Sequence, residues 1–125
     1  KKIIFLFLFS SLFFSCSFNG IENQSKGSLV IRNDSESNTT VIDSVYVKEQ
    51  DKSGFTLVFT GEIKNQSSHF IQLEPGKYSV KVRVKETMGI LEKYTFYETG
   101  YNSYKELKRD AFINAAFDGK GLYFE

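Results

Sequence analysis

Apolar and polar residues of the region 28–125 alternate with the period of β-strands. The clearest stretch runs from Tyr78 to Lys85, where Tyr78, Val80, Val82 and Val84 alternate with serine, lysine and arginine. Successive side chains of a strand point to opposite faces of its sheet, so this pattern predicts one buried and one solvated face. We therefore expect the sheet that contains this strand to cover a core on one side.

Further β-rich runs follow one another along the chain, separated by polar or glycine-bearing stretches. These runs are 29–31, 40–48, 55–60, 68–73, 94–97, 111–117 and 122–124. They predict an all-β fold of about seven strands, an antiparallel immunoglobulin-like or transthyretin-like sandwich. Ser103 and Glu106 have the spacing of a helix capping box, so a short helix near 103–109 is the alternative to a strand there.

The first sixteen residues have a different pattern. Lys1 and Lys2 precede a largely apolar run from Ile3 to Phe14, which Ser15 and the single cysteine, Cys16, follow. A basic start, about a dozen apolar residues and a small residue at the end predict a signal peptide over residues 1–15. The run is too short for a membrane-spanning helix.

The segment Phe13-Phe14-Ser15-Cys16 resembles the lipobox of bacterial lipoproteins, in the relaxed form of spirochaetes. In that family the cysteine thiol receives a diacylglycerol, and the peptide is cut just before it. The resemblance implies lipidation of Cys16, membrane lipid as its partner and a lipid-anchored place in the bacterial cell envelope. The alternative is an ordinary secretory signal followed by an incidental buried cysteine.

The net charge of the chain indicates which kinds of partner are unsuitable. Without residues 1–15, 14 basic residues face 15 acidic ones, a net charge of −1 with His69 neutral. Such a charge, with no sustained basic block, argues against a nucleic-acid partner.

Residues 16–27 are mostly polar or small and predict a lipidated cysteine and a flexible tether. One domain, residues 28–125, is expected to follow it.

Pro75 and Gly76 lie between two of the predicted strands. Proline presets φ near −65° and glycine accepts a positive φ, so the pair predicts a type II turn. The run from Gln72 to Val84 resembles the Leu-x-Pro-Gly-x-Tyr-x-Val-x-Val hairpins of PEGA-type, carboxypeptidase-regulatory-like and transthyretin-like modules of bacterial envelope proteins. That resemblance implies a hairpin within a β-sandwich.

The sequence offers little for catalysis. His69 is the sole histidine and alternates with Ile71 and Leu73, so we expect a strand residue that is satisfied or exposed at an edge. We expect no catalytic residue, no metal site and no cofactor, and therefore no enzyme. Five acidic residues fall at predicted strand ends and turns, where we expect them to be solvated: Glu62, Glu74, Glu86, Glu98 and Asp118.

Aromatic residues carry the main functional hint. Four tyrosines lie within eleven positions: Tyr94, Tyr97, Tyr101 and Tyr104. Neighbours in a strand point to opposite faces, so some of these rings must be exposed, and we predict a ligand-binding role for them. The alternative is that a chain with 13 phenylalanines and no tryptophan simply places tyrosine at the margins of its core.

Three functions follow from these patterns. The first is an envelope lipoprotein with a non-catalytic binding or structural β-sandwich, whose partner is a cell-wall, host or envelope protein component. The second is a small-ligand, carbohydrate-binding or inhibitor module that uses the tyrosines of 94–104. The third is an enzyme. An exposed apolar or open-edge surface favours the first, a concave aromatic pocket the second, and converging carboxylates the third.

Overall fold

The computed structural model describes residues 26–100 and 103–125, and all regular secondary structure in these ranges is β-strand. The predicted signal peptide, Cys16, most of the tether and Tyr101 lie outside them. The nine strands are β1 (Gly27–Asn33), β2 (Thr40–Glu49), β3 (Thr56–Ile63), β4 (Ser67–Leu73), β5 (Gly76–Met88), β6 (Leu91–Glu98), β7 (Lys105–Leu107), β8 (Phe112–Phe117) and β9 (Leu122–Phe124).

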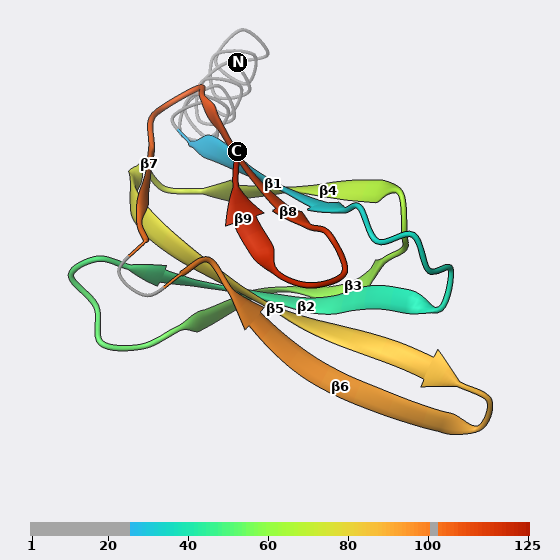
Figure 1. Cartoon of the computed structure of the whole chain (residues 1–125). Helices are drawn as coiled ribbons and strands as arrows, with labels where there is room; N and C mark the ends of the chain where they lie inside the picture. Colours follow the sequence, from blue (N-terminus) through green and yellow to red (C-terminus); the bar gives the residue numbers. More distant parts are fainter. Residues whose placement is uncertain (1–25, 101–102) are drawn as a thin grey trace, which may run out of the picture.

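The strands form two sheets that lie face to face (Figure 1). One has the order β4-β1-β8-β9, and the other has the order β3-β2-β5-β6 with β7 also paired to β5. Neighbouring strands are antiparallel, except that β1 and β8 are parallel. The predicted all-β sandwich is thus confirmed, with nine strands and one parallel pair.

The core lies between the two sheets, as the alternating pattern requires. Tyr78, Val80, Val82 and Val84 of β5 are all buried, whereas their neighbours Lys81 and Arg83 are only partly covered. Side chains from both sheets meet these residues, chiefly Leu29, Ile31, Ile42, Val45, Ile113 and Phe117. The period of two in the sequence therefore identifies the buried face of β5 correctly.

The segment 103–109 contains a strand, and the alternative of a short helix is wrong. Its residues Lys105 to Leu107 pair with the first residues of β5, and Leu107 is buried in the core. β6 pairs with β5 only from Lys81 onward, so β7 completes the same edge of β5. A capping-box signal is local and weak, and sheet pairing with burial of Leu107 outweighs it.

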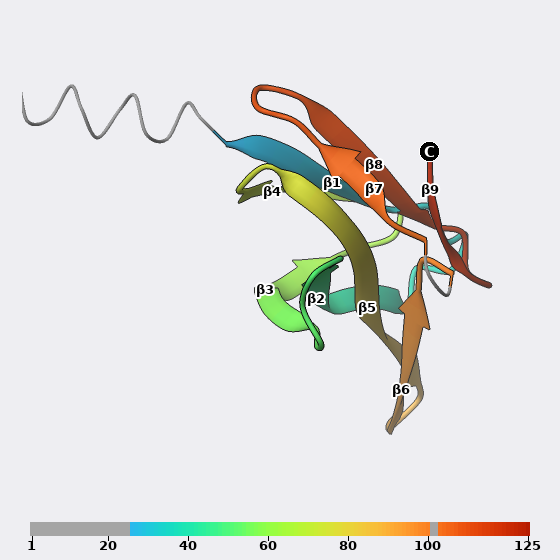
Figure 2. The ribbon, with the colours of Figure 1, turned by 90° about the vertical axis from the view of Figure 1, so that its left-hand side faces the viewer.

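The predicted type II turn at Pro75 and Gly76 is also wrong. Gly76 does not have a positive φ, and it is already the first residue of β5. The two strands that flank this link belong to different sheets, so they form no hairpin with each other. Glu74 and Pro75 instead carry the chain across the end of the sandwich (Figure 2).

A buried asparagine joins the two sheets at the end of β1. The side-chain nitrogen of Asn33 donates hydrogen bonds to the carbonyl oxygens of Thr40 at 3.0 Å and Ile63 at 2.9 Å. Its side-chain oxygen accepts one from the backbone N–H of Ser35 at 3.1 Å. Asn33 lies in the first sheet, whereas Thr40 and Ile63 lie in the second. Its amide therefore satisfies three backbone groups where the chain passes between layers.

The turn between β8 and β9 is organised by Asp118. Its carboxylate accepts hydrogen bonds from the backbone N–H groups of Lys120 at 2.8 Å and Gly121 at 2.9 Å. These bonds favour the charged form and lower the pKa of Asp118 below its ordinary value of 3.8. Gly119 has a φ of +97°, which glycine accepts without strain.

This pKa shift gives a pH-dependent prediction. A depressed pKa in the folded state stabilises the fold above pH 3.8, and this stabilisation is lost as the pH falls through the folded-state pKa. Asp118→Ala should therefore lower the melting temperature at neutral pH, and the deficit should shrink at about pH 2. Asp51→Ala, in an exposed loop, is the control. An equal deficit at both pH values would contradict this role.

Candidate functional site

The outer face of the five-stranded sheet carries a group of aromatic and cationic side chains. We call it the aromatic face, and its residues are Tyr46 of β2, Phe55 in the loop before β3, Lys81 and Arg83 of β5, and Tyr94 and Phe96 of β6. Register explains the grouping, because Lys81 lies opposite Tyr46 and Arg83 lies opposite Phe96. Residues directly opposite one another in a sheet share a face.

Lys81 lies at the centre of the aromatic face. Its ammonium nitrogen is 5.0 Å from the ring centroid of Tyr46, 4.6 Å from that of Phe55 and 5.1 Å from that of Phe96. Each distance is short enough for a cation–π interaction. The rings of Tyr46 and Phe96 are 6.0 Å apart and tilted by 53°. The lysine thus fixes three rings that come from two strands and a loop.

Arg83, two residues after Lys81 on β5, is also held by contacts with its neighbours. Its guanidinium makes two hydrogen bonds of 2.9 Å to the carboxylate of Asp43, and its carbon lies 4.8 Å from the ring centroid of Tyr94. The hydrogen bonds to Asp43 raise the pKa of Arg83 above its usual value. The Tyr94 hydroxyl donates to Glu92 at 2.8 Å, and this bond raises the pKa of Tyr94. Both groups therefore keep their protons at neutral pH.

This arrangement suits binding better than proton transfer. Phe96 and Tyr94 leave 53% and 48% of their surfaces exposed, so ring area is available to a partner. The contacts of Lys81 and Arg83 position the rings before a ligand arrives, which reduces the entropy lost on binding. Arg83 holds its proton, so its guanidinium serves as a fixed hydrogen-bond donor rather than as a base.

The predicted tyrosine group is divided by the structure. Tyr94 lies on the aromatic face, whereas Tyr97 points to the interior and packs on Phe117 with ring centroids 4.8 Å apart. The Tyr104 hydroxyl accepts a hydrogen bond from the Lys48 ammonium. Tyr101 is outside the described residues. Tyr94, Tyr97 and Tyr104 therefore form no single site, and the role predicted for the four tyrosines stays a prediction.

Sequence reasoning missed most of the aromatic face. Tyr46 and Phe55 lie far from Phe96 in the sequence, and only sheet pairing brings these rings to Lys81. The sequence did show that two cations, Lys81 and Arg83, occupy outward positions of β5. Cations at such positions are equally expected on an ordinary solvated face. The register with β2 and β6, which decides what these cations meet, depends on contacts between distant segments.

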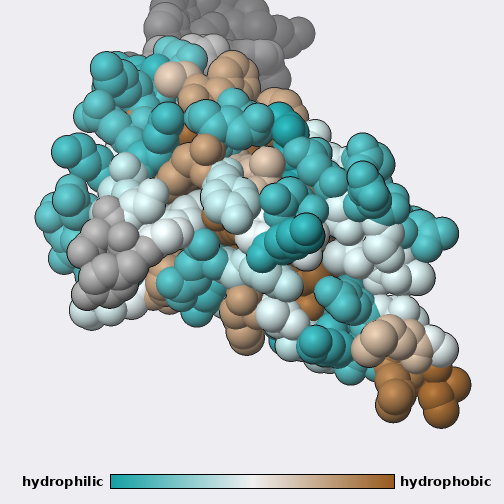
Figure 3. All heavy atoms as spheres, viewed as in Figure 1, coloured by the Kyte–Doolittle hydropathy of each residue, from teal (hydrophilic) through white to brown (hydrophobic). Residues whose placement is uncertain are grey.

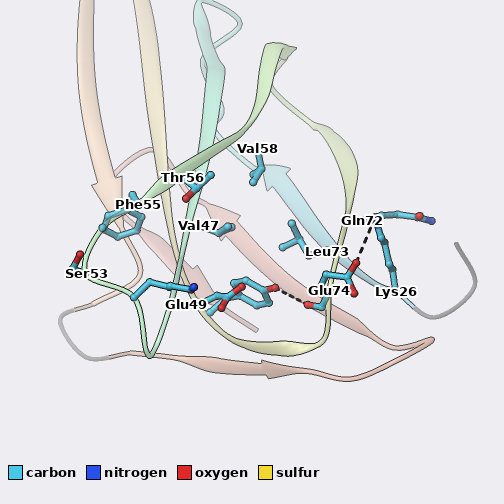
Figure 4. Close-up of a pocket in the computed structure, with 13 residues that line it drawn as sticks. Lys26, Val47, Glu49, Ser53, Phe55, Thr56, Val58, Gln72, Leu73 and Glu74 are labelled. Atoms are coloured by element: carbon cyan, nitrogen blue, oxygen red, sulfur yellow. Dashed lines mark hydrogen bonds and ion pairs between the residues drawn. The ribbon is translucent and has the colours of Figure 1, made fainter. Parts of the chain in front are cut away.

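A cleft of about 640 Å³, which shares Phe55 with the aromatic face, opens at the end of the sandwich where β1 and β5 begin (Figure 4). Val47, Val58 and Leu73 give it an apolar wall, and Tyr78 lies beside them. Charged residues also line the cleft, namely Lys26, Glu49, Lys52 and Glu74. The cleft therefore combines an apolar surface with charges of both signs.

Tyr78 ties one side of the cleft to the turn before β5. Its hydroxyl donates to the backbone oxygen of Glu74 at 2.6 Å, and the Lys26 ammonium lies 3.8 Å from the Glu74 carboxylate. Burial raises the pKa of Tyr78, and the nearby charges of Glu49 and Glu74 raise it further. The phenol is therefore neutral at physiological pH and acts as a hydrogen-bond donor.

The remaining chemical candidates are dispersed. His69 is an exposed residue of β4, an edge strand, as expected. Its ring centroid lies 4.2 Å from that of Phe59, and the two rings are tilted by 36°. Within residues 26–100 and 103–125, no three acidic, histidine or cysteine side chains gather in a way that could hold a metal ion. The same part of the chain contains no helix long and apolar enough to cross a membrane.

The described part of the chain is therefore a two-sheet β-sandwich that carries aromatic rings, held in place by cations, on one outer face. No protein-family model, curated protein or solved structure matches this chain.

Proposed function

We propose that this protein is a lipoprotein of the bacterial cell envelope, anchored through acylated Cys16, whose β-sandwich is a non-catalytic binding module. The membrane part of the proposal is supported by the basic start, the apolar run and the lipobox-like segment that ends at Cys16. The binding part is supported by one observation above all. Half-exposed aromatic rings are held on an outer sheet face by Lys81 and by Arg83, whose guanidinium is paired with Asp43.

Persistent anchoring follows from the number of acyl chains. Each buried CH₂ contributes about 0.8 kcal/mol and a single chain gives only marginal binding, so two or three chains keep a protein on its membrane. A tether of about ten residues between Cys16 and the first strand leaves the sandwich free to meet a cell-wall, host or envelope protein partner.

Metabolic labelling tests the anchor. Cells that produce the full chain are fed a fatty-acid analogue, and the purified protein is examined for label. Wild type should incorporate label and Cys16→Ala should not, because only the thiol can accept the diacylglycerol. Equally little label in both proteins, or an unmodified thiol in the mass spectrum of wild type, would contradict acylation and favour an ordinary secretory signal.

A carbohydrate ligand is the second candidate. The observation that favours it is the neighbourhood of the exposed Tyr94 and Phe96 rings, where Arg83, Asp43 and Glu92 offer polar groups beside flat apolar surface. Such a combination can stack on a sugar ring and hydrogen-bond its hydroxyls.

Purified cell-wall sacculi are the probe for this candidate. Phe96→Ser should reduce retention of the protein on sacculi at least tenfold, since it removes a half-exposed ring from the aromatic face. Phe112→Ser is the matched control, because Phe112 is 62% exposed on the other sheet. Equal retention of the two variants would exclude the aromatic face as a sacculus-binding surface.

A further inference from the structure

The turn between β5 and β6 exposes three large apolar side chains. Ile90 is 99% exposed, Leu91 is 67% exposed and Met88 is 54% exposed. We call these three residues the apolar tip. Figure 3 shows it as a hydrophobic group at lower right, where Figure 1 places the β5–β6 turn. Four uncharged residues, Met88 to Leu91, therefore form the end of a projecting hairpin.

The β5–β6 turn does not need a large apolar residue in order to form. Met88 pairs with Leu91, so Gly89 and Ile90 are the two residues of the loop. Gly89 has a φ of +64° and Ile90 does not have a positive φ, which matches a type II′ turn with glycine in its first central position. A polar residue would serve equally well at position 90. The exposed isoleucine thus has no role in making the turn.

The apolar tip is separate from the hydrophobic core. The last core residue of β5 is Val84, and the next inward position is Glu86, which lies opposite Lys93 of β6. β2 begins opposite Glu86, so the hairpin extends past its neighbour in the sheet. Four charged residues surround the base of the tip and form its collar: Lys85, Glu86, Glu92 and Lys93. The tip therefore contributes nothing to core packing.

The apolar tip also lies at the opposite end of the domain from the start of β1, where the chain enters the domain. Gly27, where β1 begins, lies against Leu107, which pairs with Gly76 at the start of β5. Figures 1 and 2 both place the β5–β6 turn at the far end from the start of β1. The 13 residues of β5 span about 40 Å. Lys26 lies ten positions after Cys16, and a chain of that length reaches at most about 35 Å, which is less than the length of β5.

From these observations we infer that the apolar tip inserts into an apolar pocket on a partner protein, whose rim carries both acidic and basic groups facing the collar. This inference rests on the proposed binding function and names a contact surface for it other than the aromatic face. Ile90 is the central anchor, and Met88 and Leu91 cover its sides. A fully exposed large side chain at the apex of a fixed turn is suited to such a role.

Charge favours a protein over a lipid surface as the occupant. Segments that insert into bilayer interfaces carry lysine, arginine and tryptophan beside their apolar residues. The collar instead has two glutamates and two lysines, so its net charge is zero and an anionic membrane would give it no net attraction. A protein pocket with an apolar centre and a mixed polar rim can match both signs. The placement of the tip, away from the entry of the tether, agrees with this choice.

Site-specific photo-crosslinking of the full chain in its own cells tests the inference. Benzoylphenylalanine is placed at position 90, at position 96 on the aromatic face and at position 120 in the exposed β8–β9 turn. Position 90 should give a protein adduct of one discrete mass, and position 120 should give none. Adding Met88→Ser and Leu91→Ser should reduce that adduct at least tenfold, with an unchanged melting temperature because both residues lie outside the core.

Each other outcome has a definite meaning. An adduct at position 96 but not at 90 would overturn the tip as the docking site and leave the proposed binding function standing. Adducts at neither position would contradict both. A lipid adduct at position 90, or an adduct that the two serine substitutions leave unchanged, would also overturn the inference.

The affinity of the crosslinked partner for variants of this protein is the decisive measurement. Once that partner is purified, its affinity for Ile90→Ser should be at least tenfold weaker than for wild type. Thr87→Ser is the matched control, since it changes an exposed residue of the same hairpin outside the apolar tip. A change of less than twofold for Ile90→Ser would show that the crosslink reports proximity and not docking.

Discussion

Val82→Asp is expected to destabilise the domain severely at neutral pH. Val82 is fully buried on the inner face of β5, where Val45 of β2 lies opposite it. An unpaired carboxylate at this position would lose its hydration and gain no partner, at a cost of more than about 4 kcal/mol. Domains of this size have total stabilities of roughly 5 to 15 kcal/mol. Circular dichroism and chemical denaturation would measure the loss.

Two control variants separate charge from packing. Val82→Ala removes two methyl groups without adding charge and should cost about 2 kcal/mol. Lys85→Asp places the same carboxylate on the opposite, outer side of the strand and should change stability by less than about 1 kcal/mol. Val82→Asp should also recover part of its stability below about pH 5, because the protonated acid is neutral. Equal losses for Val82→Asp and Lys85→Asp would contradict the observed facing of β5.

Asn33→Ala should produce the second-largest loss, roughly 3 to 5 kcal/mol. The substitution leaves three backbone groups without their partner: the carbonyl oxygens of Thr40 and Ile63 and the N–H of Ser35. A buried polar group that loses its hydrogen bond costs about 1 to 3 kcal/mol. Asn33 is 0% exposed in the folded chain, so access of water to these groups is restricted.

Asn38→Ala is the matched control for this prediction. Asn38 is exposed in the loop that follows β1, so the same atoms are removed without breaking a buried network. Its effect should stay within about 0.5 kcal/mol. Urea denaturation of both variants gives the comparison. A loss below about 1 kcal/mol for Asn33→Ala would show that the two sheets do not depend on this amide.

The strands of the fold could be predicted because their signal is local. In β5, every second residue from Tyr78 to Val84 is apolar and buried, and the run 111–117 followed by 122–124 becomes the hairpin of β8 and β9. Each of these features needs only the period of two or a nearby glycine turn. The strand that these runs did not include is β7, which has only three residues.

Features that involve two distant segments were predicted less well. Pro75-Gly76 has the composition of a type II turn, but β4 pairs with β1 and β5 pairs with β2, so the link crosses between sheets. The capping-box spacing at Ser103 is overridden by pairing with the start of β5. In both places the local preference amounts to about a kilocalorie per mole, less than the strand pairing and burial that oppose it.

The same limit applies to the candidate site. The tyrosines of 94–104 are close in sequence, yet alternation sends Tyr94 outward and Tyr97 inward. The aromatic face draws on β2, β5, β6 and the loop before β3, and its grouping around Lys81 requires their register. Exposure of Ile90 was equally hidden, because an apolar residue in a sequence does not reveal whether another strand covers it.

The sequence by itself determined the β character of the described part of residues 28–125 and the buried face of β5, because each is written in consecutive residues. That the segment ending at Cys16 anchors the protein to lipid stays a prediction. Only the tertiary structure decided which strands share a sheet, how Asn33 joins the layers, which rings surround Lys81 and that the β5–β6 turn extends beyond the core. These features depend on register and layering, which arise when segments far apart in the chain bury their apolar faces against one another.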